Sequence, residues 1–414
     1  MNSTSLHLFQ GFGIELEYML VRTSDLSVLP MTDQVLKAVA GEITEDVERD
    51  DLCWSNEIVL HLIELKTNGP APALEGIEKS FHKDIKAINA ILASHGGMLM
   101  PTAMHPTMDP VRETVLWPHG YSAVYHTYNR IFSCQGHGWS NLQSMHLNLP
   151  FAGDDEFGRL HAAIRLLLPI IPALTAASPI IEGKSTGFLD YRLEVYRKNQ
   201  IKIPQLTGAV IPEPVFTIRD YESEILERCY QAIKPLDSEG LMQEEWLNSR
   251  GAIARFERNA IEIRIIDIQE APSADVAIAA LVASALKHMV SEDFTSYEMQ
   301  KAWQTDALAS IFLKTIEHAD EAMIHNPDYL RAVGFNGAGP VTAGELWKYL
   351  FNKFLGEPSS NMNYFQKTLS TIVEKGPLAR RILRRTGLKP SKTMIHDVYR
   401  ELCSCLAEDR LFLP

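Results

Sequence analysis

The sequence predicts an α+β fold in which helices cover one face of a single β-sheet. Four segments alternate apolar and polar side chains with the period of a β-strand, namely residues 12–20, 58–66, 141–149 and 261–267. Residues 74–94 instead place apolar side chains every three or four positions and stop at Gly96-Gly97, which is typical of an amphipathic helix. From residue 291 onward the pattern is helical. We therefore expect a sheet in the first part of the chain and helices in the last.

The first strand carries two carboxylates on one face. Residues 12–20 place Ile14, Leu16 and Tyr18 on one side, and Glu15 and Glu17 together on the other. Carboxylates this close repel each other, so a covered face would need cations, water or arginine beside them. The alternative is a half-buried strand whose acidic face is simply solvated.

The second strand has Glu64 and Lys66 on one face and ends at the turn signal of residues 67–70. In an unbroken strand, the side chains of Glu57 and Glu64 would point to opposite faces of the sheet. To share a site with Glu64, it must enter from the preceding loop or across a bulge. Both alternatives stay open at the level of the sequence.

The third and fourth strands carry polar pairs as well. In residues 141–149, His146 and Asn148 share a face, and in residues 261–267 Glu262 and Arg264 do so. A lone histidine at such a position is more often a core residue with one hydrogen bond than a ligand. Four polar pairs opposite apolar faces, however, favour one sheet that turns a carboxylate-rich face toward a ligand.

The segments between these strands receive simpler interpretations. We expect a helix at residues 31–40, an acidic connector at 42–51, a strand at 98–104 and an aromatic loop over a pocket at 117–138. Further expectations are a helix at 156–178 kinked near Pro169 and Pro172, an extended loop at 201–214 and a helix at 221–234. Residues 183–187 resemble the end of a phosphate-binding P-loop, but Ser178 stands where that motif needs glycine.

The last part of the chain begins with an alanine-rich helix running to Met289, which Ser273 or Asp275 can cap. Breaks are expected around Pro327, 337–340, Pro358 and Pro390. The arginines at 380, 381, 384 and 385 are interpreted as a solvated basic helix face rather than a nucleic-acid site.

Composition limits the classes of protein. The 414 residues are 46% hydrophobic and 22% charged, with a net charge of −13 and a pI near 5.6, which argues against nucleic acid as a partner. Five irregularly spaced cysteines suit a reducing compartment, and no run of 18 apolar residues indicates a membrane span. We expect a cytoplasmic protein, in which the glycosylation pattern at residues 2–4 has no role. The oligomeric state is open, and a homo-oligomer is allowed.

The polar face has the composition of a cation site. Carboxylates with one imidazole are mostly oxygen ligands, which suit Mg²⁺ or Mn²⁺ rather than structural zinc. Divalent ions held by glutamates, with arginines nearby, can position a nucleoside triphosphate and neutralise charge during phosphoryl transfer.

Taken in order, the motifs resemble the glutamate-cysteine ligases and related carboxylate-amine ligases. They comprise Gly13-x-Glu-x-Glu17, Glu57 with Glu64, Gln143-x-x-His146, Gly183-x-Ser-Thr-Gly187 reaching Arg192, and Glu262-x-Arg264-x-x-Asp267. The resemblance implies the catalytic fold of glutamine synthetase: a curved antiparallel sheet with helices on its outer side. It covers about residues 11–290, so we expect a catalytic domain at 1–290 and a helical region at 291–414 packed on it.

The resemblance also implies roles for individual residues. Glu15, His146 and Glu262 would hold a Mg²⁺ or Mn²⁺ ion on the nucleotide side, and Glu17, Glu57 and Glu64 one on the substrate side. Arg264 and Arg192 would act in catalysis by holding the transferring phosphate or the substrate carboxylate. The candidate ATP-binding residues are Lys66, Asn148, Thr186 and Arg255. Many relatives have a second histidine in the third strand, where this chain has Asn148.

The implied reaction uses ATP to activate a carboxylate, most simply the side chain of glutamate, as an acyl phosphate that an amine such as cysteine converts to an amide. Two alternatives belong to other classes. One is a phosphotransferase of the guanidino-kinase type, which would release a stable phosphorylated product. The other is a non-catalytic sensor of ATP or amino acids, which has less need of six metal ligands and Arg264.

Overall fold

A computed structural model describes residues 6–357 and 361–414. Its main sheet has the strand order β2-β3-β4-β1-β6-β10-β9, with β5 also paired to β1, and every pairing is antiparallel. The strands are β1 (Gly13–Arg22), β2 (Asp46–Glu48), β3 (Leu52–Asn56), β4 (Leu62–Thr67), β5 (Gly97–Met100), β6 (Ser144–Pro150), β9 (Ala252–Arg255) and β10 (Ala260–Asp267). The predicted α+β fold with one antiparallel sheet is confirmed.

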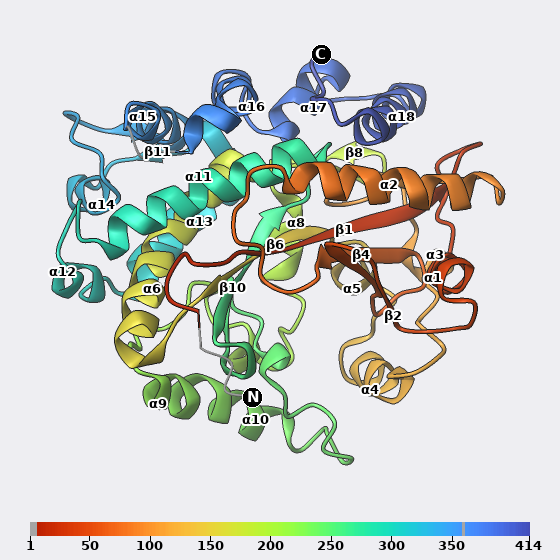
Figure 1. The fold of residues 1–414 in the computed structure, drawn as a ribbon, viewed down its shortest axis with the longest axis horizontal. Coiled ribbons are helices and arrows are strands. Elements are labelled where there is room, and N and C mark those ends of the chain that lie inside the picture. The colour runs from red at the N-terminus through yellow and green to blue at the C-terminus, as the bar shows by residue number, and fades with distance from the viewer. Residues whose placement is uncertain (1–5, 358–360) are drawn as a thin grey trace.

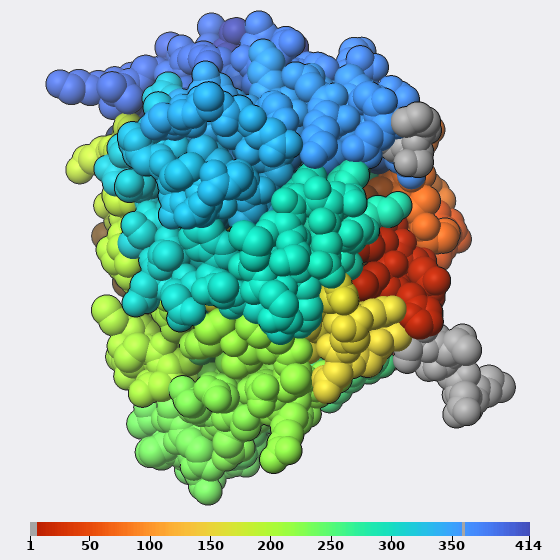
Figure 2. Space-filling view, turned by 90° about the vertical axis from the view of Figure 1, so that its left-hand side faces the viewer, coloured from red at the N-terminus to blue at the C-terminus, as the bar shows by residue number. Residues whose placement is uncertain are grey.

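The molecule is layered. In Figure 1, α2 (Ile77–Ala93) and α11 (Pro272–Val290) lie across the sheet, and the C-terminal helices lie beyond them. These outer helices are α15 (Ala343–Leu355), α16 (Met362–Lys375), α17 (Leu378–Thr386) and α18 (Lys392–Glu408). Figure 2 shows that the C-terminal part forms the upper layer and that the green segment with α9 (Ile218–Tyr221) and α10 (Glu227–Ile233) forms the lower one. The division into two domains at residue 290 stays a prediction.

The remaining helices fill the flanks. They are α1 (Thr32–Ala40), α3 (Pro110–Glu113), α4 (Ser122–Phe132), α5 (His137–Ser140), α6 (Gly153–Leu167), α7 (Ile171–Thr175), α8 (Tyr191–Tyr196), α9 (Ile218–Tyr221), α10 (Glu227–Ile233), α12 (Tyr297–Lys301), α13 (Thr305–His318) and α14 (Pro327–Ala332). Two small hairpins join β7 (Ile180–Ile181) to β8 (Lys184–Ser185) and β11 (Met323–Ile324) to β12 (Val341–Thr342). In Figure 1, α4, α9 and α10 lie on the side of the sheet away from α2 and α11.

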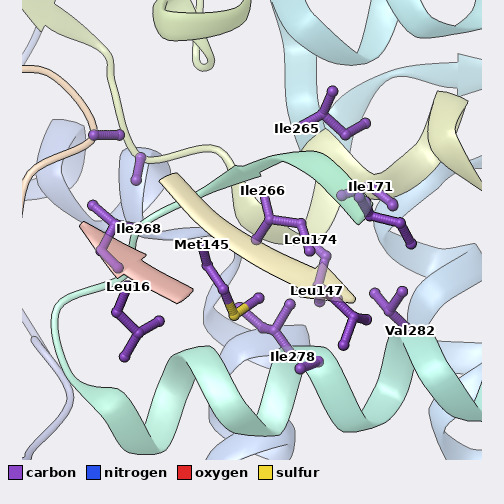
Figure 3. Close-up of a cluster of buried hydrophobic side chains, with 14 of the residues drawn as sticks. Leu16, Met145, Leu147, Ile171, Leu174, Ile265, Ile266, Ile268, Ile278 and Val282 are labelled. Atoms are coloured by element: carbon purple, nitrogen blue, oxygen red, sulfur yellow. The ribbon is translucent and has the colours of Figure 1, made fainter. Parts of the chain in front are cut away.

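The core lies between the apolar face of the sheet and the helices on it. Figure 3 shows Leu16, Met145 and Leu147 from β1 and β6 facing Ile278 and Val282 of α11. All of these side chains are inaccessible to solvent. Burying a side chain of this size stabilises the fold by about 1.5–3 kcal/mol relative to exposure, which fixes which sheet face is covered. The opposite face is thereby left to the polar pairs.

Two helical stretches are long and apolar enough to cross a membrane by length and composition alone, 153–175 and 272–290. In the fold, 94% and 72% of their most apolar windows are buried. Their apolar character is accounted for by packing within this protein, because α11 faces the sheet (Figure 3) and α6 packs on α11. The first stretch is broken at Pro169 and Pro172, as predicted, by a 3₁₀ turn between α6 and α7.

Several local predictions were wrong. The aromatic segment 117–138, predicted to be a loop, contains α4, and the acidic connector 42–51 contains β2. The predicted strand at 58–66 starts only at Leu62, while the separate strand β3 precedes it. Neither Ser273 nor Asp275 caps α11, because its N-cap is Ala271 and the Asp275 carboxylate accepts the backbone N–H of Gln269 at 2.9 Å.

The arginine cluster on α17 is not a uniform solvated face. Arg384 and Arg385 are exposed, but Arg381 is inaccessible to solvent and pairs with the equally buried Glu270. Arg380 pairs with Asp320 at 2.9 Å. The pattern of charges alone could not reveal this, because a buried ion pair and a surface one have the same residue types. The glycosylation pattern at residues 2–4 and the helix break at Pro358 lie outside the described residues.

Three buried histidines are expected to make the fold sensitive to acid. Burial lowers the pKa of His61 to about 4 and that of His161 to about 3, and it lowers the pKa of His105 as well. An unfolded histidine has a pKa near 6.5, so the unfolded chain binds protons first as the pH falls. The free energy of unfolding should therefore decrease between about pH 6.5 and 4, by up to about 1.4 kcal/mol per histidine and pH unit.

Urea unfolding across this pH range measures the effect. We expect a shallower slope of the free energy of unfolding against pH in His61→Gln and an unchanged slope in the control His95→Gln, whose side chain is exposed. Equal slopes in His61→Gln and the wild type would contradict the assignment of a neutral, buried His61.

Candidate active site

Strand register places the predicted polar pairs side by side. Glu15 of β1 lies opposite Lys66 of β4 on one side and His146 of β6 on the other, and Glu17 lies opposite Glu64. On the next strand, Glu262 of β10 lies opposite Asn148. Because directly opposed residues share a face of the sheet, the pairs from four strands form one continuous polar surface.

A bulge in β10 extends this surface. Ile263 pairs with Leu147 and Ile266 with Met145, so β10 has one extra residue over that interval. The extra residue places both Glu262 and Asp267 on the polar face, although they are five positions apart. Asp267 then lies opposite Ser144, and its Oδ1 accepts a hydrogen bond from Arg192 Nη1 at 3.3 Å.

His146 is at the centre of the first of two potential metal-ligand groups. Its Nδ1 is 2.7 Å from Glu15 Oε2 and 3.7 Å from Glu262 Oε1, and one ligand atom from each of the three residues lies within 4.8 Å of the others. Asn148 Nδ2 donates to the other oxygen of Glu15 at 3.1 Å. The structure thus brings together Glu15, His146 and Glu262, the three residues expected on the nucleotide side.

The second group consists of Glu17, Glu64 and again His146, whose Nε2 is 3.8 Å from Glu17 Oε1. The backbone N–H of Ser144 donates to Glu17 at 2.6 Å, and Lys66 Nζ donates to Glu64 at 2.8 Å. These bonds fix the directions of both carboxylates. The sequence placed Glu57 in this group, whereas the geometry brings His146 there.

Glu57 enters from the loop between β3 and β4. Of the two alternatives that the sequence left open, the preceding loop or a bulge, the structure therefore has the loop. It lines the same cavity as Glu17 and His146. Burial, and next the charges of Glu64 and Glu17, raise the pKa of Glu57 well above its usual value. A carboxylate crowded in this way would be relieved by a nearby cation.

The electrostatics of the remaining ligands differ between the two groups. Burial raises the pKa of Glu17 despite its attraction to His146. Burial also raises the pKa values of Glu15 and Glu262, but other interactions outweigh it. The hydrogen bond from His146 holds the pKa of Glu15 below its usual value. The charge of Arg264 does the same for the pKa of Glu262. Burial opposes the charged form of His146, yet Glu15 and Glu17 raise its pKa to about 9. The surface therefore concentrates negative charge around one imidazole.

Three arginines border the carboxylates. Arg264 Nε lies 3.0 Å from Glu262 Oε1, and Arg255 donates to Glu262 Oε2 at 3.1 Å. Arg192 of α8 donates to Asp267 and, at 2.9 Å, to the backbone carbonyl of Arg264. The Nε atoms of all three arginines have no hydrogen-bond partner among the described residues. All three arginines also line the cavity described below, where their terminal N–H groups can contact an anionic ligand.

A cavity of about 740 Å³ opens over this surface, within the size range of small-molecule sites. Glu17, Ser144, His146, Arg192 and Arg264 form its floor. The sequence did not identify its aromatic wall, which comprises Tyr121, Tyr125, Tyr128, Trp139, Tyr196 and Trp246. The available signal was the density of aromatic residues in 117–138, which predicted a loop over a pocket; Trp139, Tyr196 and Trp246 lie outside that segment.

The four candidate ATP-binding residues have different surroundings. Lys66, Asn148 and Arg255 contact the glutamates of the polar face, as described above. Thr186 lies in the β7–β8 region, where its hydroxyl donates to the carbonyl of Phe188 at 3.1 Å and accepts from its N–H. It is not among the described residues that line the cavity. The structure therefore does not bring Thr186 to the site, because its own turn uses its hydroxyl group.

Comparisons with known sequences give consistent results. A protein of Archaeoglobus fulgidus, named only as uncharacterized, is 33% identical over 310 residues, or 73% of this chain and 83% of its own. A Nocardioides protein named "Putative glutamate--cysteine ligase 2-1" is 22% identical over 305 residues, 73% of each chain.

Two crystal structures share the fold at low sequence identity. A glutamate-cysteine ligase of Francisella tularensis, in complex with AMP, superposes with a TM-score of 0.63 at 11% identity, over 97% of this chain and 90% of that one. A bifunctional glutathione synthetase of Pasteurella multocida gives a TM-score of 0.57 at 14% identity, over 97% of this chain and 53% of that one. The sequence model of glutamate-cysteine ligase family 2 (GCS2) matches residues 11–404, and this chain therefore belongs to that family.

Proposed function

We propose that this protein is an ATP-dependent carboxylate-amine ligase that forms a C–N bond between a glutamate-like acid and an amine. The observation that carries the proposal is the pair of ligand groups on one sheet face that share His146. Membership of GCS2 supports the same class of reaction.

The residues fit divalent cations. Both groups are rich in carboxylate oxygens, the ligands that Mg²⁺ and Mn²⁺ prefer. The five cysteines are buried free thiols, and neither group contains one. Glu15, His146 and Glu262 would hold one ion, and Glu17 and Glu64, with Glu57 beside them, the other. Such ions neutralise the charge of the ATP phosphates during transfer. Burial, and after it the charges of neighbouring carboxylates, raises the pKa values of Glu17 and Glu57, which supports a cation at the second group.

The chain's own groups then have defined tasks. Arg264 and Arg192 hold the γ-phosphate or the substrate carboxylate through guanidinium N–H groups, for which the planar fork is suited. Lys66, Asn148 and Arg255 fix the glutamates of the polar face and border the nucleotide. The surrounding protein orients both substrates, which reduces the entropy lost in the reaction step.

The reaction balances in two steps. An oxygen of the substrate carboxylate attacks the γ-phosphorus of ATP, ADP leaves, and an acyl phosphate forms. The nitrogen of the amine then attacks the acyl carbon, inorganic phosphate leaves, and the nitrogen loses one proton to give the amide. We propose the side-chain carboxylate of glutamate as the acid, which makes the intermediate γ-glutamyl phosphate.

The test is ADP release with ATP and Mg²⁺, with and without glutamate, across a panel of amines that includes cysteine, with products identified by mass. We expect ADP release that depends on both the acid and an amine and yields a γ-glutamyl amide. A stable phosphorylated product without an amide would instead indicate a phosphotransferase. Binding of Mg-ATP without turnover of any acid or amine would indicate a sensor.

A further inference from the structure

We infer that the amine substrate carries no carboxylate and has an apolar body that packs against aromatic rings, so that it is neither cysteine nor another free amino acid. This inference rests on the proposed ligase function. It follows from the charges of the cavity, from the aromatic wall and from the conformation of Tyr121.

The described cations of the cavity are already paired with its carboxylates. Among its described lining residues, the permanently cationic side chains are Arg192, Arg255 and Arg264. Each is already within 3.5 Å of a carboxylate oxygen, from Asp267 or Glu262. An acid donor and its phosphate would use the free N–H groups that remain. The α-carboxylate of an amino-acid acceptor would then be desolvated without a partner, which is costly.

The mouth of the cavity is acidic. Glu244, Glu245 and Glu257 line it on the side of β9, and Arg255 is the one guanidinium there among the described residues, paired with Glu245 at 3.5 Å. Glu244 and Glu257 are exposed, and neither side chain forms a hydrogen bond or ion pair with another described residue. These carboxylates repel an anionic acceptor and attract an ammonium group.

Aromatic side chains also line the cavity. Tyr128 packs edge-on to Trp139 at a ring distance of 4.6 Å and lies 6.0 Å from Trp246, so these rings form one cluster. The cavity that they border is lined by Glu17, Glu57 and His146, together with the three arginines. The aromatic wall therefore borders the same space as Glu17 and Glu57, where we place the donor and the acceptor. Aromatic rings bind apolar bodies by burial and ammonium groups by cation–π attraction.

Tyr121 supplies an independent observation. Its side chain is 69% exposed at the edge of the cavity, and its φ is +60°, a left-handed conformation that is unfavourable for a bulky residue. Its ring makes no side-chain hydrogen bond and no ring contact with another described residue. Nothing in the described fold uses this ring, so we assign it to contact with the acceptor.

The experiment uses amine pairs that differ only in the carboxylate: tyramine against tyrosine, and cysteamine against cysteine. We expect kcat/KM to be at least ten-fold higher for the carboxylate-free member of both pairs. Equal values, or a preference for the amino acid in either pair, would overturn the inference. Hydroxylamine, which traps an acyl phosphate as a hydroxamate, separates the two proposals. Hydroxamate without the expected preference refutes the acceptor inference alone, whereas no hydroxamate and no amide refute the ligase itself.

Two variants test the named groups. Glu244→Arg should raise kcat/KM for tyrosine relative to tyramine at least five-fold, because it offers the carboxylate a partner. Tyr121→Asn, whose new side chain tolerates the left-handed backbone, should raise the KM for tyramine with the KM for ATP unchanged. The matched controls are Glu48→Arg on the exposed edge strand β2 and Tyr364→Asn on α16, another exposed tyrosine. An unchanged tyrosine-to-tyramine ratio in Glu244→Arg, together with an unchanged KM in Tyr121→Asn, would overturn the inference.

Discussion

Replacing Glu262 with glutamine is expected to lower ATP turnover about 100-fold or more while the chain stays folded. The substitution keeps the size of the side chain but removes the charge that Arg255 and Arg264 both contact and that completes the first ligand group. Steady-state ADP release measures the loss, and thermal unfolding establishes that the fold is retained. His146→Ala should have a comparable effect, because both ligand groups include this imidazole.

The control for Glu262→Gln is Glu48→Gln, which makes the same chemical change on an exposed strand of the same sheet. It should turn over ATP like the wild type. Wild-type turnover in both Glu262→Gln and His146→Ala would show that these residues are not part of the catalytic site.

Replacing Arg381 with methionine is expected to cost about 3–5 kcal/mol of unfolding free energy, because it leaves the carboxylate of Glu270 buried and unpaired. The Arg381 guanidinium also donates to the carbonyl of Phe412 at 2.9 Å, and the N–H of Phe412 donates to Glu270 at 3.1 Å. This pair therefore ties α17 and the C-terminal end of the chain to the segment between β10 and α11.

Urea denaturation measures the effect, with Arg385→Met as the control on the same helix. Arg385 is exposed, so its replacement should change the unfolding free energy by no more than about 0.5 kcal/mol. The double variant Arg381→Met with Glu270→Met should recover most of the loss, because neither charge then remains buried. A single variant Arg381→Met as stable as the wild type would contradict this account.

The sequence predicted the polar face of the sheet well because a strand has a strict period of two residues. Glu15 with Glu17, His146 with Asn148 and Glu262 with Arg264 needed only that period to be placed on one side. The pairing of the strands was not predicted; the registers of β1, β4, β6 and β10 in the structure bring these polar faces together.

The positions that the sequence left open or placed wrongly are those where a period is interrupted. Asp267 joins the polar face only through the bulge after Ile263, and Glu57 only through the loop between β3 and β4. Neither feature has a local signal, because both arise from pairing with distant strands. Thr186 was placed by a short motif alone, and short motifs do not specify what a hydroxyl group contacts.

The aromatic wall escaped prediction for a different reason. Within residues 117–138, Val124, Tyr128 and Ile131 follow a helical spacing in α4, but this short repeat lies between segments rich in glycine and histidine. Tyr128 packs inward while Tyr121 is exposed at the cavity. Tertiary contacts, rather than the local sequence, decide which of these rings face the ligand.

The most direct test of the ligase mechanism follows one oxygen atom. Glutamate labelled with ¹⁸O in its side-chain carboxylate is incubated with ATP, Mg²⁺ and an amine, and the released phosphate is analysed by mass. Because the carboxylate oxygen attacks phosphorus and then leaves with the phosphate, the account predicts one ¹⁸O atom in each phosphate released. Released phosphate that lacks ¹⁸O would contradict the acyl phosphate and the function that we propose, whether or not an amide forms at the same time.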